Sequence, residues 1–336
     1  MSLYRAETRR LTKRRFTRWL VIGALVVLVL VAVGVALTNK KVGPAEIAEA
    51  KAEATASFQE NLRYAQEELQ RCQAAVGTAE ASRYPTDCSQ MYMPTEEEYD
   101  YRGYMDSTFD FRANFGNMIT TWAALLAMMA FVVGASYVGA EWSTGGMMNL
   151  LLWRPQRLKV LGTKLGALLS GLAVLSVVVA VLWTGLFVLI ASLRGTLDGM
   201  TAGAWQSFAL TELRGLVLIL VSAAVGFGLA SLGRHTALAL GAVVGAIVVF
   251  QFGLVTVLSL AQVKYAEAWL LPTWALTWMD KKVVLQDYNS CNFSAVSGCQ
   301  PPELTLTWPM AGGLMAIAVF LVVGAAMWTM RSRDIT

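Results

Sequence analysis

Six stretches of the chain are apolar and almost free of charge, and charged segments separate most of them. They cover residues 19–37, 117–140, 165–193, 215–233, 236–261 and 308–330. Each is long enough to cross a hydrocarbon core of roughly 30 Å as a helix. The pattern predicts an all-α integral membrane protein with six transmembrane helices. Because this number is even, both termini are predicted to lie on one side of the membrane.

The charges outside these stretches predict the orientation. Segments 1–18 and 141–164, with the residues that follow the fourth and sixth stretches, carry a net charge of +11, and the remaining segments sum to −7, which gives the +4 of the whole chain. Lys and Arg that flank membrane helices stay in the cytoplasm. Both termini are therefore predicted to be cytoplasmic, with segments 38–116 and 262–307 extracellular.

Segment 1–18 is strongly basic, and Arg5, Arg9 and Lys13 recur at a spacing of four, on one side of a helix. We expect a cytoplasmic interfacial helix that attracts anionic membrane lipid. The alternative is that these charges serve only to orient the first span, 19–37. The apolar run of that span exceeds the length usual for a secretory signal, so we expect it to be retained.

The extracellular segment 38–116 predicts a helical insertion between the first and second spans. Pro44 suits a first helical turn and Gly77 a C-terminal stop. Between them, apolar residues recur at steps of three or four, which places them on one helical face. They are Ile47, Ala50, Ala54, Phe58, Leu62, Ala65, Leu69, Cys72 and Val76.

All four cysteines lie in segments predicted to be extracellular, namely Cys72, Cys88, Cys291 and Cys299. An even set in an oxidising compartment indicates disulfides, and unpaired thiols are the alternative. Four cysteines allow three connectivities, of which we favour the two local pairs. The second pair lies in segment 262–307, which begins with a short, Trp-rich apolar part at 266–279. That part is too short to span and predicts re-entrant or interfacial helices.

The sequence offers little catalytic chemistry. The composition, 56% hydrophobic and 15% charged, excludes an ordinary soluble domain. The six spans carry no buried carboxylate for ion coupling, and one histidine, His235, makes no metal site. The phosphate-binding pattern G-x-x-x-x-G-K-[ST] is absent. We therefore expect no catalytic residue, metal, cofactor or nucleic-acid partner, and any energy for transport must come from ATP hydrolysis in another polypeptide.

Such a motor needs a cytoplasmic docking surface, and loop 141–158, with the sequence EWSTGGMMNLLLWRPQR over residues 141–157, is the most substantial one. Ser143 or Thr144 can cap a short helix, and Pro155 ends it. Its apolar residues, Met147, Leu150, Leu151 and Trp153, suit a groove of a partner. The alternative is an interfacial helix whose apolar face lies in lipid.

This loop resembles the signature of type-2 ABC-transporter permeases. In that signature a glutamate at the inner end of the second span precedes an aromatic residue, a small pair, a leucine-rich helix, a Pro followed by Arg, and a Lys that opens the third span. These features fall on Glu141, Trp142, Gly145 with Gly146, Leu150 to Leu152, Pro155 with Arg157, and Lys164. The resemblance extends to nearly the whole chain. Gly146 replaces a more usual threonine, and segment 38–116 is longer than in compact members.

The resemblance implies a half-transporter of an ABC exporter in a plasma membrane, such as the bacterial cytoplasmic membrane. Two copies of the permease, or this chain and a homologous permease, would pair with two copies of a separate ATPase that binds ATP and Mg. The loop would act as the coupling helix, and Glu141 would hold it to Arg157 or to the N-terminal helix. The residues assigned to coupling are Glu141, Trp142, Gly145, Met147, Leu151, Arg154, Pro155 and Arg157.

A second hypothesis is a non-transporting membrane sensor or assembly scaffold with an extracellular binding domain. A membrane-embedded enzyme is disfavoured because no His, Asp or Cys cluster lies near the spans. Apolar spans suit a lipid, peptide or hydrophobic drug as cargo better than a small ion. The G-x-x-x-G pairs Gly162 with Gly166 and Gly241 with Gly245 could permit close helix contact at a dimer seam.

Overall fold

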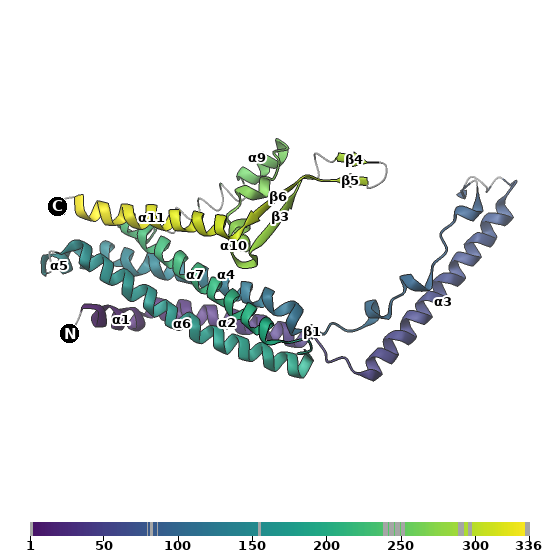
Figure 1. Cartoon of the computed structure of the whole chain (residues 1–336), viewed down its shortest axis with the longest axis horizontal. Helices are drawn as coiled ribbons and strands as arrows, with labels where there is room; N and C mark the ends of the chain where they lie inside the picture. Colours follow the sequence, from purple (N-terminus) through teal and green to yellow (C-terminus); the bar gives the residue numbers. More distant parts are fainter. Residues whose placement is uncertain are drawn as a thin grey trace. The chain divides into compact units, whose positions relative to one another are not determined.

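The computed structural model of the protein describes residues 3–78, 80, 83–85, 87–153, 156–237, 241, 245, 249, 253–287, 292–294 and 298–332. The described residues are mainly helical (Figure 1). They form two compact units. The helical unit comprises Met1–Ala32, Arg112–Phe187 and Gly199–Thr336, and the α3 unit comprises Val33–Phe111 and Val188–Asp198.

Among the described residues, five helices are long and apolar enough to cross a membrane. They are α2 (Arg15–Thr38), α4 (Phe111–Ser143), α6 (Arg157–Arg194), α7 (Ala202–Gly233) and α11 (Trp308–Ser332). Each contains one predicted span. The remaining predicted span, 236–261, is described only in part, and α9 (Val255–Leu260) is the helix described within it. The structure thus supports a multi-pass membrane protein with five candidate spans.

Helices α4 and α7 form the core of the helical unit. Burial within the chain covers 56% of the most apolar window of α4 but 11% of that of α2 and α11. The backbones of α4 and α7 touch, because a Cβ on Gly134 would lie 2.3 Å from the Ala223 carbonyl oxygen and one on Gly226 would lie 2.3 Å from the Phe131 carbonyl oxygen. Within the chain, a Cβ on Gly162 or Gly166 would meet no atom within 4 Å, so this G-x-x-x-G pair does not form the contact between α4 and α7.

The α3 unit is built on α3 (Pro44–Ala75), which has Pro44 in its first turn. The Gly43 N–H donates to the Glu46 carboxylate at 3.0 Å, which satisfies one of the free donors at the start of the helix. Gly77 has a φ of +83° just beyond the other end, a conformation that glycine adopts without strain. The helix therefore begins and ends where the sequence predicts.

A disulfide between Cys72 and Cys88, with a Cα–Cα distance of 6.0 Å, folds the following segment back onto α3. The rings of Phe58 and Tyr99 pack with centroids 5.6 Å apart, which continues the contact along the helix. Three 3-10 turns carry this segment, η2 (Cys88–Gln90), η3 (Glu96–Glu98) and η4 (Tyr101–Tyr104). This local pair is confirmed. The other predicted pair, Cys291 with Cys299, lies outside the described residues because Cys291 does.

Two short contacts close the α3 unit at its other end. Strand β1 (Phe109–Asp110) pairs in parallel with β2 (Gly195–Thr196). The Lys40 ammonium lies 2.8 Å from the Asp106 carboxylate, and the hydrogen bond to that carboxylate raises the pKa of Lys40. The segment between the first and second spans is thereby tied to the residues that follow α6.

The part of the chain before α11 contains strands as well as the expected short helices. A 3-10 turn, η6 (Ala266–Trp269), and α10 (Leu271–Asp280) occupy the Trp-rich part. Strands β3 (Lys282–Gln286) and β6 (Glu303–Thr307) then pair antiparallel, and β4 (Asn292–Ser294) pairs with β5 (Gly298–Gln300). The strands were not predicted, although the alternation of polar and apolar residues in Glu303–Thr307 favours one.

Candidate functional site

The most distinctive site of the helical unit is a buried ion pair between α1 (Leu3–Lys13) and α6. The Lys164 Nζ lies 2.8 Å from the Glu7 Oε2, and neither side chain is exposed. Removing both ions from water costs several kcal/mol each, so the pair requires close geometry and further polar partners. Both requirements are met by residues of α4.

Glu141, near the end of α4, supplies a second carboxylate to the same lysine. Its Oε2 lies 2.7 Å from Lys164 Nζ, and its side chain is 21% exposed. Arg10 lies at the outer edge, with its guanidinium 3.4 Å from Glu7 and 4.0 Å from Glu141. Two cations thus face two carboxylates, and the formal charges of the four residues cancel. We call Glu7, Arg10, Glu141 and Lys164 the ionic cluster.

Tyr137 completes the hydrogen bonding of the ionic cluster. Its hydroxyl donates to Glu7 Oε2 at 2.8 Å, and the Lys164 ammonium lies 5.4 Å from the centre of its ring. Separate contacts hold α1 and the start of α2 beside the cluster. The Arg14 guanidinium donates to the Ser136 carbonyl oxygen at 2.9 Å, and the hydroxyls of Tyr4 and Ser170 are 2.6 Å apart. The N-terminal helix is therefore fixed to both α4 and α6.

The predicted coupling helix is α5 (Gly146–Trp153), which follows α4 after a tight turn. Gly145 has a φ of +71° in that turn, a conformation costly for residues with a side chain. The expected caps are corrected: the hydroxyls of Ser143 and Thr144 both donate backward to the Ala140 carbonyl oxygen. They close the end of α4, and the glycine lets the chain turn into α5.

The apolar residues of α5 are divided between two faces. Met147 and Leu151 are buried within the chain, whereas the side chain of Leu152 is 84% exposed. The two buried residues fix α5 to the helical unit, so any role of Met147 and Leu151 in coupling would act through packing rather than through contact with a partner. Arg154 and Pro155 lie outside the described residues.

Trp142 connects the end of α4 to α7. The Arg234 guanidinium, in the residue that caps α7, lies 5.1 Å from the centre of the Trp142 ring, within range of a cation–π interaction. At Gly139, one turn earlier, a Cβ would lie 2.5 Å from the Thr236 hydroxyl oxygen. The chain beyond α7 is therefore packed directly against α4 beside the α5 turn.

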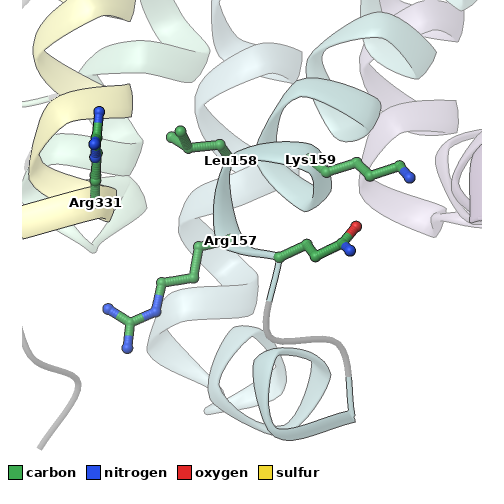
Figure 2. Close-up of a pocket in the computed structure, with 5 residues that line it drawn as sticks. Arg157, Leu158, Lys159 and Arg331 are labelled. Atoms are coloured by element: carbon green, nitrogen blue, oxygen red, sulfur yellow. The ribbon is translucent and has the colours of Figure 1, made fainter.

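Arg157, one of the two partners expected for Glu141, lies at the first turn of α6. There it lines a shallow cavity together with Leu158, Lys159 and Arg331, as Figure 2 shows. The ion pairs of Glu141 are to Lys164 and to Arg10 of the N-terminal helix, the second of the expected partners. The site thus combines Glu141 with residues 157 positions apart in the chain.

Sequence reasoning missed Glu7, Tyr137 and the burial of Lys164. A usable signal was present, because Glu7 is the sole acid among seven basic residues in segment 1–18. Glu212, which lies within α7, accepts a hydrogen bond from Thr184 of α6. Charged side chains within the helices find their partners on other helices. The residue pattern along a single helix does not reveal such pairs.

Among the described residues, no cluster of His, Cys, Asp or Glu could hold a metal ion. The site has mechanical rather than chemical features. A short helix, α5, carries one exposed leucine and connects α4 to α6, and buried charges hold α1, α4 and α6 together. With the five candidate spans, these features define a multi-pass membrane protein.

The comparison with family models identifies the family. The model described as ABC-2 family transporter protein matches residues 1–332, and the chain belongs to that family. Membership supports a role as a transport permease and, in general, partnership with an ABC ATPase. A comparison with curated proteins finds no match to the chain.

Proposed function

We propose that this chain is the transmembrane permease subunit of an ATP-driven exporter, and that α5 is its coupling helix. The observation that carries the proposal is the ionic cluster, in which Lys164 of α6 lies between Glu7 of α1 and Glu141 of α4. A separate ABC ATPase, in two copies, would bind ATP and Mg, and this chain would hold no cofactor and catalyse no reaction.

The ionic cluster suits the transmission of force. A push on α5 reaches α4 through the turn at Gly145 and reaches α6 through the chain that joins them. Separating these helices would leave a buried charge without a partner, which costs roughly 3–5 kcal/mol. Helix α1, the end of α4 and the start of α6 therefore move together more readily than apart, and displacement of α5 becomes displacement of the spans.

The orientation and assembly follow from charge and burial. The basic segments at the α5 end favour a cytoplasmic location for that end and for both termini, in a plasma membrane such as that of bacteria. Because little of α2 and α11 is buried within the chain, both offer apolar surface to lipid or to a second permease copy, so we propose a homodimer beside the ATPase pair.

Cross-linking tests the docking of α5. The chain with Leu152→Cys would be purified from solubilised membranes of its host and treated with a cysteine-directed cross-linker. We expect an adduct with a protein that contains a phosphate-binding loop, and a purified complex that hydrolyses ATP. Tyr64→Cys on α3, an exposed residue, is the matched control. Equal adducts at both positions, or a partner that hydrolyses no ATP, would overturn the proposal in favour of a sensor or scaffold.

A further inference from the structure

Glu212 of α7 is a carboxylate of the helical unit that forms no ion pair with any described residue. Its described partner is the Thr184 hydroxyl of α6, which donates a hydrogen bond to Oε1. Thr184 lies ten residues before Arg194, the last residue of α6, which at 1.5 Å per residue is about 15 Å inside that end. The hydrogen bond therefore holds the Glu212 carboxylate beside the apolar part of α6.

The described residues give Glu212 no countercharge. None of the six predicted spans contains a Lys or an Arg. Arg214 lies two positions further along α7 and on a different side of it, because successive residues of a helix are about 100° apart. Its guanidinium donates to the Met279 carbonyl oxygen of α10 at 3.3 Å. An ionisable group without a countercharge in a membrane span is costly and is typical of a binding site or a pathway.

The surroundings of Glu212 favour an organic cation over a metal ion. Ca²⁺ and Mg²⁺ take roughly six or more oxygen ligands, whereas no group of acidic residues that could hold a metal ion occurs among the described residues. Phe208 lies four positions before Glu212, on the same side of α7. Its ring is partly exposed and packs edge-on against Phe115, with centroids 5.3 Å apart. A carboxylate beside an aromatic ring suits an ammonium group, which both attract.

The residues next to this site are apolar and uncovered. Leu213, beside Glu212, is 54% exposed, and Val181, about one turn before Thr184, is 67% exposed. A Cβ on Gly185, which follows Thr184, would meet no atom within 4 Å. Helices α6 and α7 therefore offer apolar surface next to the hydrogen bond that joins them. A small hydrophilic amine would make no use of this surface, whereas an alkyl chain would cover it.

We propose that Glu212 binds the ammonium group of a cationic amphiphile that enters from the membrane. Thr184 holds the carboxylate in place, and the Phe208 ring contacts the ammonium. The alkyl chain lies along Val181 and Leu213. Binding requires α6 and α7 but no ATPase partner, so failure of this site would leave the proposed function standing. A bound ligand would bridge the third and fourth predicted spans.

Binding to the purified full-length chain in phosphatidylcholine nanodiscs tests the site. The probe is dodecyltrimethylammonium, dodecanol is the uncharged comparison, and binding to empty nanodiscs is subtracted. We expect saturable binding of the ammonium probe with a raised Tm, and no saturable binding of dodecanol. Glu212→Gln keeps the shape of the side chain and removes its charge. It should weaken binding of the ammonium probe by about tenfold, the loss expected when an interaction with a charged group is removed.

The matched control is Glu267→Gln, which removes an exposed carboxylate outside α6 and α7. Equal losses in the two variants would show that the probe responds to overall charge and would overturn the site. Equal binding of the two probes would also overturn it, because partition into the bilayer needs no carboxylate. A change from dimer to monomer in Glu212→Gln alone would identify a contact between copies and would overturn the proposal as well.

A second measurement does not require substitution. A hydrophobic carbodiimide adds covalently to carboxyl groups that it reaches from the membrane, and peptide mapping identifies the modified residue. We expect Glu212 to be modified in the unaltered chain, and dodecyltrimethylammonium but not dodecanol to protect it. Modification that the ammonium probe leaves unchanged would contradict the proposal. The absence of modification at Glu212 would contradict it too, even if Glu212→Gln failed to fold.

Discussion

Lys164 of α6 and Glu7 of α1 lie 2.8 Å apart with both side chains fully buried. An interaction of this kind links the N-terminal helix to the third predicted span at a point that hydropathy alone assigns to a loop. Its partners, Glu141 and Tyr137, both come from α4. The pair is therefore the point at which three helices depend on one another.

Removing the lysine tests that dependence. Lys164→Met should lower the free energy of unfolding by roughly 3–5 kcal/mol, because two carboxylates are left without their buried cation. Unfolding in detergent, followed by tryptophan fluorescence, measures the change. Lys159→Met, at an exposed position on the same helix, should change stability by less than about 0.5 kcal/mol. Adding Glu7→Gln to Lys164→Met should recover part of the lost free energy of unfolding. If the effects of the two single substitutions were strictly additive, Glu7 and Lys164 would not interact directly.

Tyr137→Phe removes one hydroxyl and nothing else from the cluster. Because this hydroxyl donates to the buried Glu7 carboxylate, its loss should cost roughly 1.5–3 kcal/mol of stability. The same unfolding experiment measures it. Tyr64→Phe on α3, where the ring is exposed, is the control and should be nearly silent. If Tyr137→Phe left stability unchanged, the Glu7 carboxylate would have sufficient partners without the tyrosine hydroxyl.

Two adjacent glycines, Gly145 and Gly146, lie where the chain turns into α5. We expect substitutions of the two to have different effects on stability. Gly145 has a φ of +71°, so Gly145→Ala should cost roughly 1–2 kcal/mol and misplace α5. Gly146 lies in α5, and an added Cβ would meet neighbours at ordinary contact distances. Gly146→Ala should therefore be tolerated. In the complex with its ATPase, we expect Gly145→Ala alone to uncouple ATP hydrolysis from transport. Equal behaviour of the two variants would argue against a mechanical role for the turn.

The Cys72–Cys88 disulfide should hold the segment that folds back along α3 in place. It closes a sequence separation of 16 residues, and a loop of that size gains roughly 3 kcal/mol from cross-linking. Replacing both cysteines by serine should make the segment between Cys88 and Tyr104 sensitive to added protease. The helices of the helical unit should retain their resistance. Unchanged digestion would show that contacts such as Phe58 with Tyr99 suffice.

The sequence predicted those features that depend on local composition. Continuous apolar runs identified five helices, and Pro44 and Gly77 marked the ends of α3. The ionic cluster could not be predicted in this way, since Glu7, Glu141 and Lys164 come from three separated segments and each resembles a solvated charge near a helix end. Only their convergence in three dimensions shows that they compensate one another.

The structure of loop 141–158 was predicted in part for the same reason. A short apolar helix follows from its composition, but Met147 and Leu152 are equally apolar, and the fold alone decides which of them is buried. The hydroxyls of Ser143 and Thr144 can serve either the preceding or the following helix. The positive φ at Gly145 marks the turn between the two helices. Because Ser143 and Thr144 precede this turn, both hydroxyls bond to a carbonyl group at the end of α4.

The glycines that join α4 and α7 limit how this protein can change shape. At Gly134 and Gly226 each backbone meets the other with no side chain between them, so there are no rotamers whose rearrangement would let one helix slide along its neighbour. Translation by even one residue would drive a Cβ into a carbonyl oxygen. The two helices are therefore built to tilt as a single rigid body, and a passage for cargo must open along some other face of the bundle.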